Sequence, residues 1–419
     1  MSLLARPLLS AVRRGGPSAR LSKCLRRQFG STSPACAIRA TFTMTDDEEL
    51  NQTLKTIQDT IIFPALLPPR QRKIVFDPKK REYMEENPVI IEVDDQEFRL
   101  KSLDRFHGIE NSKTIFIKAL SRMRTPADWA NLAPLLAGYK KAGIQLLNCH
   151  WGKVARLAGS NGNIQAVIEC AKQWRETGLT LANREMMTRI FVHNNERIYK
   201  SGYDKSKTLR ALAQSEMLLD LLSMPQHALP VSESGSSPAC ARLIRGMHLY
   251  ATCSAMIARQ KDGEDISKEI GLLRGQLTSY MSIWDSTSLE DIGQIPELSD
   301  LNPTADRQAV KRRRRSSALN GCGYIQVISQ VLKGIELAVQ LVGYDARYLT
   351  RVRDALEAHL KGFVRTAYNW EEYWKDEYAT IVGRRPQWPP NERPAAEAQP
   401  RTEEAGESHL EASGGTSTV

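Results

Sequence analysis

The pattern of apolar and polar residues is helical along most of the chain. From about residue 105, apolar positions recur at intervals of three and four residues, interrupted by glycine, proline and polar clusters. Thr125-Pro126-Ala127-Asp128 has the order of a helix start, with a capping hydroxyl, a proline at the first helical position and an acid in the first turn. Helices are predicted near residues 126–142, 146–157, 163–177, 181–197, 205–223, 237–260, 264–284, 321–342 and 345–378.

The part before residue 105 has a different pattern. Thr45, followed by four acidic residues, predicts a capped helix start, and the helix is expected to end before Pro64. Residues 88–100 are rich in β-branched residues before Asp94-Asp95, and apolar and polar residues alternate after it. This pattern indicates a β-hairpin. The predicted fold is therefore predominantly α, a helical-hairpin array or bundle with one small N-terminal β-hairpin.

Two helical segments match each other at a spacing of 35 residues. The offset pairs Leu132 with Val167, Tyr139 with Trp174, Gly143 with Gly178, Ile144 with Leu179 and Leu146 with Leu181. A helix that ends in glycine, an apolar residue, any residue and leucine thus recurs. This pattern resembles the pentatricopeptide repeat family over one full unit, residues 144–178, plus flanking half-units. The resemblance implies helix pairs that stack into a solenoid; a generic helical bundle is the alternative, and no base-reading residues are carried over.

Charge identifies the N-terminal segment. Residues 1–45 contain eight basic and no acidic residues, namely Arg6, Arg13, Arg14, Arg20, Lys23, Arg26, Arg27 and Arg39. These cations lie among leucine, alanine, serine and glycine, a composition typical of a mitochondrial presequence. Residues 1–40 are predicted to be that presequence, cleaved between Gln28 and Met44, with a disordered basic arm as the alternative. The predicted location is the mitochondrial matrix.

Without these eight residues the chain is nearly neutral. Of 58 basic residues, 50 remain against 48 acidic ones, a balance that permits an RNA partner without requiring one. The predicted organisation after the presequence is an N-terminal helix and hairpin segment at 46–104, a helical repeat-like domain at 105–284, a basic linker at 285–320, a C-terminal helical segment at 321–385 and a disordered acidic tail at 386–419.

The sequence offers little catalytic chemistry. The seven cysteines are dispersed without a CxxC pair, which indicates reduced thiols and no zinc site. Cys149 and His150 are adjacent and would point to different sides of a helix, so a structural role is favoured. No phosphate loop, dinucleotide-binding motif or hydrolase motif occurs. We therefore predict no enzyme activity, no cofactor and no metal. The sequence contains no run of 18 apolar residues, so we predict no transmembrane segment.

Two clusters are candidates for binding. The basic cluster consists of Arg307, Lys311, Arg312, Arg313, Arg314 and Arg315, and RNA phosphates are its favoured partner. A solvated loop and an acidic protein or lipid partner are the alternatives. Aromatic residues gather near the end of the last predicted helix, where Trp370, Tyr373 and Trp374 are candidates for docking a partner. Packing of these rings in the core is the favoured interpretation.

The predicted function follows from the address, the helices and the basic cluster. We expect a non-catalytic matrix adaptor that supports organellar gene expression, either as a mitoribosome component or as a transcript-binding factor for translation or RNA processing. Its partners would be mitochondrial RNA or the mitoribosome, together with other proteins. A respiratory-complex assembly factor that binds only proteins is the alternative, and an enzyme with an unrecognised site is a third hypothesis.

Overall fold

The computed structural model divides the chain into two units, residues 1–37 and residues 38–419. It describes residues 38–39, 41–94, 96–104, 110–227, 241–284, 289–303, 319–367 and 370–392, all of which belong to the second unit. The predicted presequence, apart from Ile38 and Arg39, therefore lies outside the described residues.

The first helix is longer than the sequence suggested. α1 (Glu48–Ile57) continues through a π-helical turn, η1 (Gln58–Ile62), into α2 (Phe63–Leu66). Its cap is the carboxylate of Asp47, which accepts a hydrogen bond from the backbone of Leu50 at 3.0 Å, and the prediction of a Thr45 cap is wrong. The helix also runs past Pro64, because the wider π turn directly before it places the proline at the start of a new helical segment, where a proline is tolerated.

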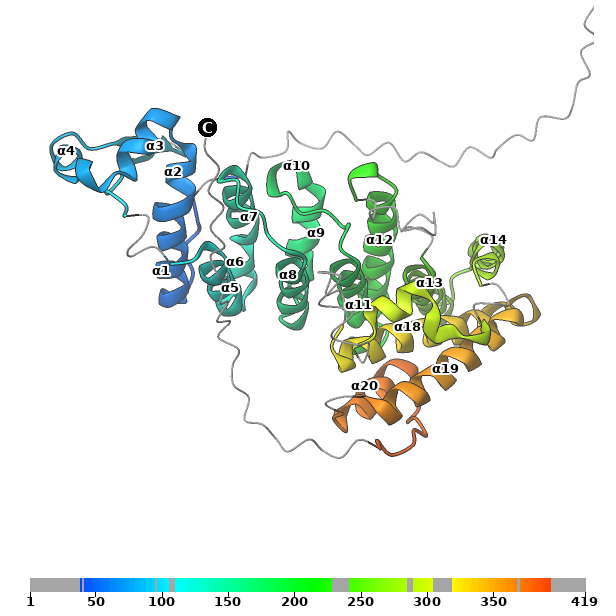
Figure 1. The fold of residues 1–419 in the computed structure, drawn as a ribbon. Helices are drawn as coiled ribbons and strands as arrows, with labels where there is room; N and C mark the ends of the chain where they lie inside the picture. Colours follow the sequence, from blue (N-terminus) through cyan, green and yellow to red (C-terminus); the bar gives the residue numbers. More distant parts are fainter. Residues whose placement is uncertain are drawn as a thin grey trace, which may run out of the picture. The chain divides into compact units, whose positions relative to one another are not determined.

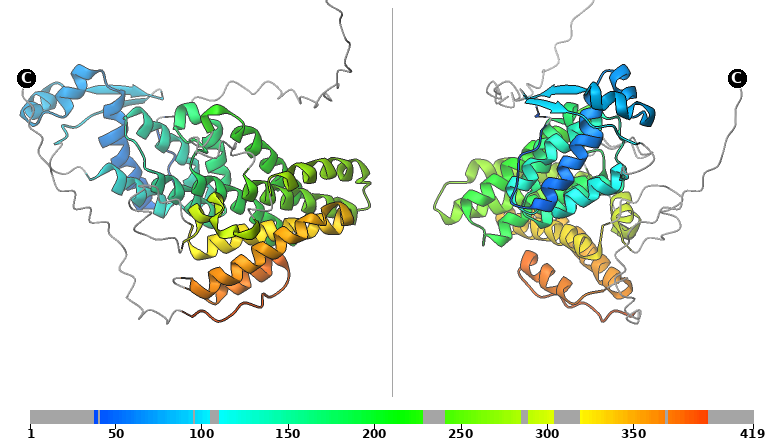
Figure 2. Two further views of the ribbon diagram at one scale, coloured as in Figure 1. Left: turned by 45° about the vertical axis from the view of Figure 1, so that its right-hand side comes forward. Right: turned by 90° about the vertical axis from the view of Figure 1, so that its left-hand side faces the viewer.

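A small insertion follows this helix. It consists of α3 (Pro69–Val75), η2 (Pro78–Lys80), α4 (Arg81–Glu86), β1 (Ile90–Val93) and β2 (Gln96–Arg99). The strands pair antiparallel with Ile91 opposite Phe98, which confirms the predicted hairpin (Figure 2). The insertion has a core of its own, made by Phe63, Leu67, Val75, Met84, Val89, Val93 and Leu100.

The middle of the chain is a series of helix pairs (Figure 1). The helices are α5 (Ser112–Arg122), α6 (Pro126–Ala130), α7 (Leu132–Lys141), α8 (Asn148–Ser160), α9 (Ile164–Lys172), α10 (Trp174–Thr177), α11 (Arg184–Lys200), α12 (Lys205–Leu222), η3 (Pro225–His227) and α13 (Arg242–Lys261). The predicted start at Thr125 is confirmed, because its side chain and that of Asp128 form a reciprocal capping box.

Alternate helices of this series pack together. Helix α7 contacts η1 and α2 on one side and α9 and α10 on the other, and these helices form a first layer. Helix α8 contacts α5 and α11, and these three form a second layer. The second layer packs tightly where α8 meets α11. Gly159 of α8 leaves no room for a side chain there, since an added Cβ would overlap the ring of His193 on α11.

The 35-residue spacing corresponds to equal local geometry. Gly143 and Gly178 both have a backbone φ of +73°, the left-handed conformation that ends a helix and that glycine adopts without strain. Leu132 and Val167 are the matching residues 11 positions before these glycines, and both are fully buried. The two segments therefore end in the same way and present the same face to the core.

The C-terminal helices surround one apolar helix. They are α14 (Ser267–Ser282), η5 (Ile292–Gln294), α16 (Pro296–Leu301), α18 (Gly321–Val342), η6 (Gly343–Ala346), α19 (Tyr348–Thr366) and α20 (Tyr373–Val382). Helix α18 packs against α13, α19 and α20 (Figure 2). By length and composition it could cross a membrane, but most of it is buried inside the protein, as in the core helix of a globular fold.

Two predictions about the C-terminal part are wrong. The single helix expected at 345–378 is divided, because α19 ends at Thr366 and Ala367 takes an extended conformation. The predicted disordered tail begins later than residue 386, since Trp388 is buried and the Asn391 side chain donates hydrogen bonds to Val364 O at 2.7 Å and Ala367 O at 3.0 Å. Residues 393–419 lie outside the described part of the chain.

Candidate nucleic-acid interface

The predicted basic cluster, Arg307 and Lys311–Arg315, lies outside the described residues. The described chain stops at Pro303 and resumes at Leu319. The two sides of this segment are joined, because the backbone N–H of Leu319 donates a hydrogen bond to Leu301 O at 2.9 Å. The described residues on either side of the cluster thus meet in the C-terminal core, and the role of the cluster stays a prediction.

The three candidate docking aromatics differ in their surroundings. Trp374 is buried, with its ring stacked on Phe363 at a centroid distance of 6.1 Å. Trp370 is half-buried and lies before α20, so it is not on one helix with Trp374, although the helix predicted at 345–378 would have held both. Tyr373 is 47% exposed. Core packing accounts for Trp374, whereas Tyr373 is accessible to a partner.

Buried polar side chains join α11 to the C-terminal helices. Asn195 donates to Gln330 Oε1 at 3.0 Å and to a backbone carbonyl of α13 at 2.9 Å. His193 Nδ1 lies 3.0 Å from Glu196 Oε1. Burial by itself would raise the pKa of Glu196, but His193 and then Lys200 lower it. The Asn195 bonds hold α11 to α13 and α18, and the His193–Glu196 contact lies within α11, so these groups are part of the core.

The isolated cysteine and histidine residues are also structural. Among the described residues, no group of three or more His, Cys, Asp or Glu side chains could hold a metal ion. Burial raises the pKa of the Cys170 thiol to about 12, which keeps it protonated and unreactive. His150 accepts a hydrogen bond from the backbone of Leu147 at 3.0 Å and so caps α8, in agreement with the structural role favoured from the sequence.

The helix pairs carry a local excess of positive charge. Residues 110–189 contain 12 basic and 5 acidic residues. Three of these acids are already engaged: Asp128 accepts two backbone N–H bonds, and Glu169 and Glu185 each pair with a cation on their own helix at 2.9 Å. The near-neutral balance of residues 46–419 concealed this excess, and a count in a moving window would have found it.

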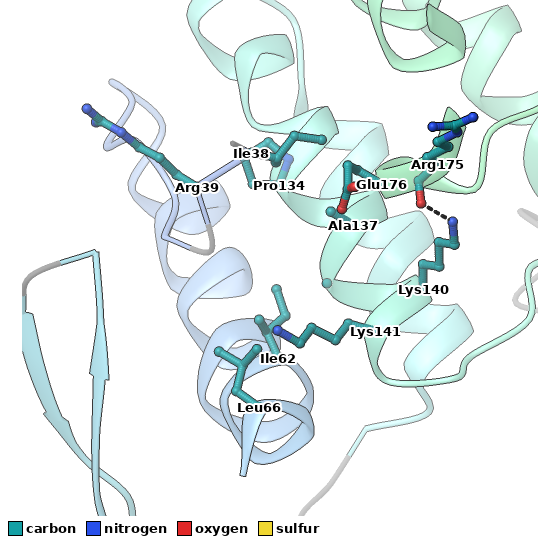
Figure 3. Close-up of a pocket in the computed structure, with 11 residues that line it drawn as sticks. Ile38, Arg39, Ile62, Leu66, Pro134, Ala137, Lys140, Lys141, Arg175 and Glu176 are labelled. Carbon is teal, nitrogen blue, oxygen red and sulfur yellow. Dashed lines mark hydrogen bonds between the residues drawn. The ribbon is translucent and has the colours of Figure 1, made fainter. Parts of the chain in front are cut away.

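Part of this charge surrounds a pocket of about 400 Å³ in the first layer (Figure 3). Apolar side chains of Ile62, Leu66 and Ala137 line one part of it, together with the cations Lys141 and Arg175. Lys140 also lines the pocket, and its ammonium donates to backbone carbonyls at the end of α10, so it completes the C-terminus of the neighbouring helix. Glu176 also lines the pocket, so its margin carries charges of both signs.

Helix pairs that pack side by side and carry an excess of cations define a helical scaffold protein. The model of a family described as mitochondrial ribosomal protein mS27 matches residues 27–381. The chain therefore belongs to the mS27 family of mitochondrial ribosomal proteins.

One curated relative shows how far this likeness extends. The small ribosomal subunit protein mS27 of Neurospora crassa is 29% identical over 206 residues, which cover 49% of this chain and 51% of the relative. The chain thus matches about half the length of that curated relative.

Family membership decides between several predictions. It confirms a mitochondrial-matrix protein and, among the predicted functions, a mitoribosome component at the level of the family. The prediction of a non-enzymatic role is confirmed because the family is one of ribosomal proteins. Neither comparison addresses the presequence or the individual RNA-binding residues.

Proposed function

We propose that this chain is a non-catalytic component of the small subunit of the mitochondrial ribosome, where it binds ribosomal RNA and neighbouring proteins. The match of the family model across residues 27–381 is the observation that carries this proposal. The excess of cations over residues 110–189 supports the RNA part of it, because phosphate contacts supply most of the sequence-independent affinity for nucleic acid.

The scaffold for this function is a pentatricopeptide-like stack. Two observations support it: Gly143 and Gly178, 35 residues apart, end their helices in the same left-handed turn, and alternate helices contact each other in two layers. In such a stack each helix pair is held by its neighbours, so surface cations keep fixed spacings. The packing of α7 on α9 and of α8 on α11 in alternating order supports this stack over a generic bundle.

Two further contacts belong to the same proposal. The basic cluster Arg307 and Lys311–Arg315 provides a second group of phosphate contacts near the C-terminal core, where the flanking residues Leu301 and Leu319 meet. Tyr373, exposed at the start of α20, offers an aromatic contact to a neighbouring protein.

Sedimentation tests this function directly. Tagged full-length chain from gently lysed mitochondria is expected to migrate with the small ribosomal subunit, and RNase should release it. Replacing Lys311–Arg315 by alanine should lower the fraction that co-sediments. Recovery only in an RNA-free protein complex would contradict the proposal and favour the assembly-factor alternative.

A further inference from the structure

Cations from neighbouring helices meet on the second layer of the stack. The ring of Phe116 on α5 and the imidazole of His150 on α8 lie 6.4 Å apart between centroids. Lys113 is one helical turn before Phe116, and Lys153 is one turn after His150, so both lie next to this contact. Arg156 is exposed one turn further along α8. We call Lys113, Lys153 and Arg156 the second-layer patch.

The third helix of the layer, α11, approaches α8 closely and carries an ion pair beside the patch. An added Cβ at Gly152 would come within 2.5 Å of Glu185 Oε2, which shows how closely α8 and α11 approach at this level. Glu185 does not neutralise the patch, because its carboxylate is paired with Arg189 at 2.9 Å. Arg189 is buried and its charge is balanced by Glu185, so α11 adds no net positive charge to the patch.

Within the described part of the chain, no member of the second-layer patch forms an ion pair. Partial burial and then the charge of Arg156 lower the pKa of Lys153. Burial and then the charges of Lys113 and Lys153 lower the pKa of His150. Like charges held together in this way repel each other, and an anion bound among them removes that repulsion.

We propose that the second-layer patch binds consecutive phosphates of an RNA backbone. This inference rests on the proposed function and adds a face of the stack to it. Neighbouring helices are about 8–10 Å apart, so Lys113 on α5 and Lys153 and Arg156 on α8 form a row that crosses two helices. An extended polyanion fits such a row better than a single small anion, and fixed lysine and arginine side chains bind backbone phosphates without reading the bases.

A natural reporter lies beside the patch. Cys149 is exposed, and its Sγ is 3.7 Å from His150 Nδ1. Among the described cysteines, Cys170 and Cys253 are buried and Cys322 is partly buried. RNA seated on the patch should therefore slow alkylation of Cys149 in the unmodified full-length chain, and alkylation sites can be separated by peptide mass.

The test compares two triple variants of the full-length chain. Lys113→Gln, Lys153→Gln and Arg156→Gln together remove the patch. Lys261→Gln, Lys268→Gln and Arg351→Gln together remove the same charges from exposed positions elsewhere, and form the matched control. The probes are a fluorescent oligouridylate of about 20 nucleotides, in the range of known single-strand sites, and a duplex RNA hairpin.

The salt dependence of RNA affinity shows whether the patch contacts phosphates. Each phosphate contact to a single strand contributes about 0.7 to the slope of log affinity against log salt, so losing three lowers the slope by about 2 and the affinity at 0.1 M salt on the order of 100-fold. The control should keep the wild-type slope. RNA should also slow Cys149 alkylation in the wild type and not in the patch variant.

Several outcomes would overturn the inference. An unchanged slope in the patch variant would do so, as would absence of binding to both RNA probes or Cys149 alkylation that RNA does not slow. If the triple variant does not fold, the wild-type alkylation and the single variant Arg156→Gln still test it. Co-sedimentation with the small subunit separates the two claims, because the chain can be a ribosomal component through other contacts even if this patch binds no RNA.

Discussion

The helix pairs at residues 110–189 and the C-terminal helices at 319–392 use charge in opposite ways. The first region has 12 basic and 5 acidic residues, and the second has 9 of each. Among the described residues of the second region, five of the nine cations form ion pairs, including Arg365 with Glu392 at 2.5 Å and Arg384 with carboxylates on both α18 and α19. In the first region four of the twelve cations pair with an acid in the described part of the chain. The first region therefore keeps a larger unpaired positive charge, whereas the second uses more of its charge to hold its own helices together.

The largest effect is expected from the core of the C-terminal region. Trp374→Ala removes a buried ring that packs on Phe363 and Trp370, and should lower the free energy of unfolding by about 3–5 kcal/mol. Chemical denaturation measures this loss. RNA affinity of the folded fraction should not change. A parallel loss of affinity would contradict the assignment of RNA binding to residues 110–189 alone.

Acid should weaken the junction between the regions through His248, which is buried on α13 with Ser215 Oγ of α12 3.0 Å from its Nδ1. Burial, and then Arg245, lowers the pKa of His248 from 6.5 to about 4. Because the unfolded chain takes up the proton at higher pH, the stabilisation is fully present above about pH 6.5 and is lost as pH falls towards 4, by about 3 kcal/mol.

Unfolding at a series of pH values checks this sign and range. His248→Gln should flatten the profile between pH 6.5 and 4. A variant profile as steep as that of the wild type would show that other groups cause the acid sensitivity.

The buried amides between α11, α13 and α18 should couple the two regions. Asn195→Leu leaves Gln330 without a donor at its Oε1 and should cost about 1–3 kcal/mol. Combining it with Gln330→Leu should cost less than the sum of the single changes, because the two amides share a hydrogen bond. Additive losses in a double-mutant cycle would mean that each side chain acts alone.

The smallest effect tests whether the two repeat-like segments are equivalent. Gly143→Ala and Gly178→Ala both force a Cβ into a left-handed conformation, and each should cost about 1 kcal/mol. Thermal unfolding measures both. Losses that differ by more than about twofold would argue against equal geometry, although Gly178 has Lys140 Cδ 3.2 Å from an added Cβ, a flexible neighbour that can move.

Local signals in the sequence predicted much of the fold. The capping residues at Thr125, the glycines at 143 and 178 and the β-hairpin all depend on neighbouring residues, and the structure confirms them. The errors arose where composition does not reveal the structure. Residues 386–392 are held by contacts with α19, which is distant in the sequence, and Pro64 is accommodated by a π turn directly before it.

The candidate site was harder to predict for a physical reason. Charge was judged over residues 46–419, where the excess at residues 110–189 is balanced by acids elsewhere. The second-layer patch also requires knowing that α5 and α8 pack side by side, and that arrangement depends on contacts such as the one between Phe116 and His150. Lys311–Arg315 stood out because its cations are consecutive, and its role awaits experiment.

Mapping of RNA-crosslinked peptides in purified small ribosomal subunits is the most direct test of the contrast between the two regions. We expect crosslinked peptides from residues 110–189, including those that contain Lys153 and Arg156, and few or none from residues 319–392. Crosslinks confined to 319–392, or none in a chain that still co-sediments with the subunit, would contradict this expectation.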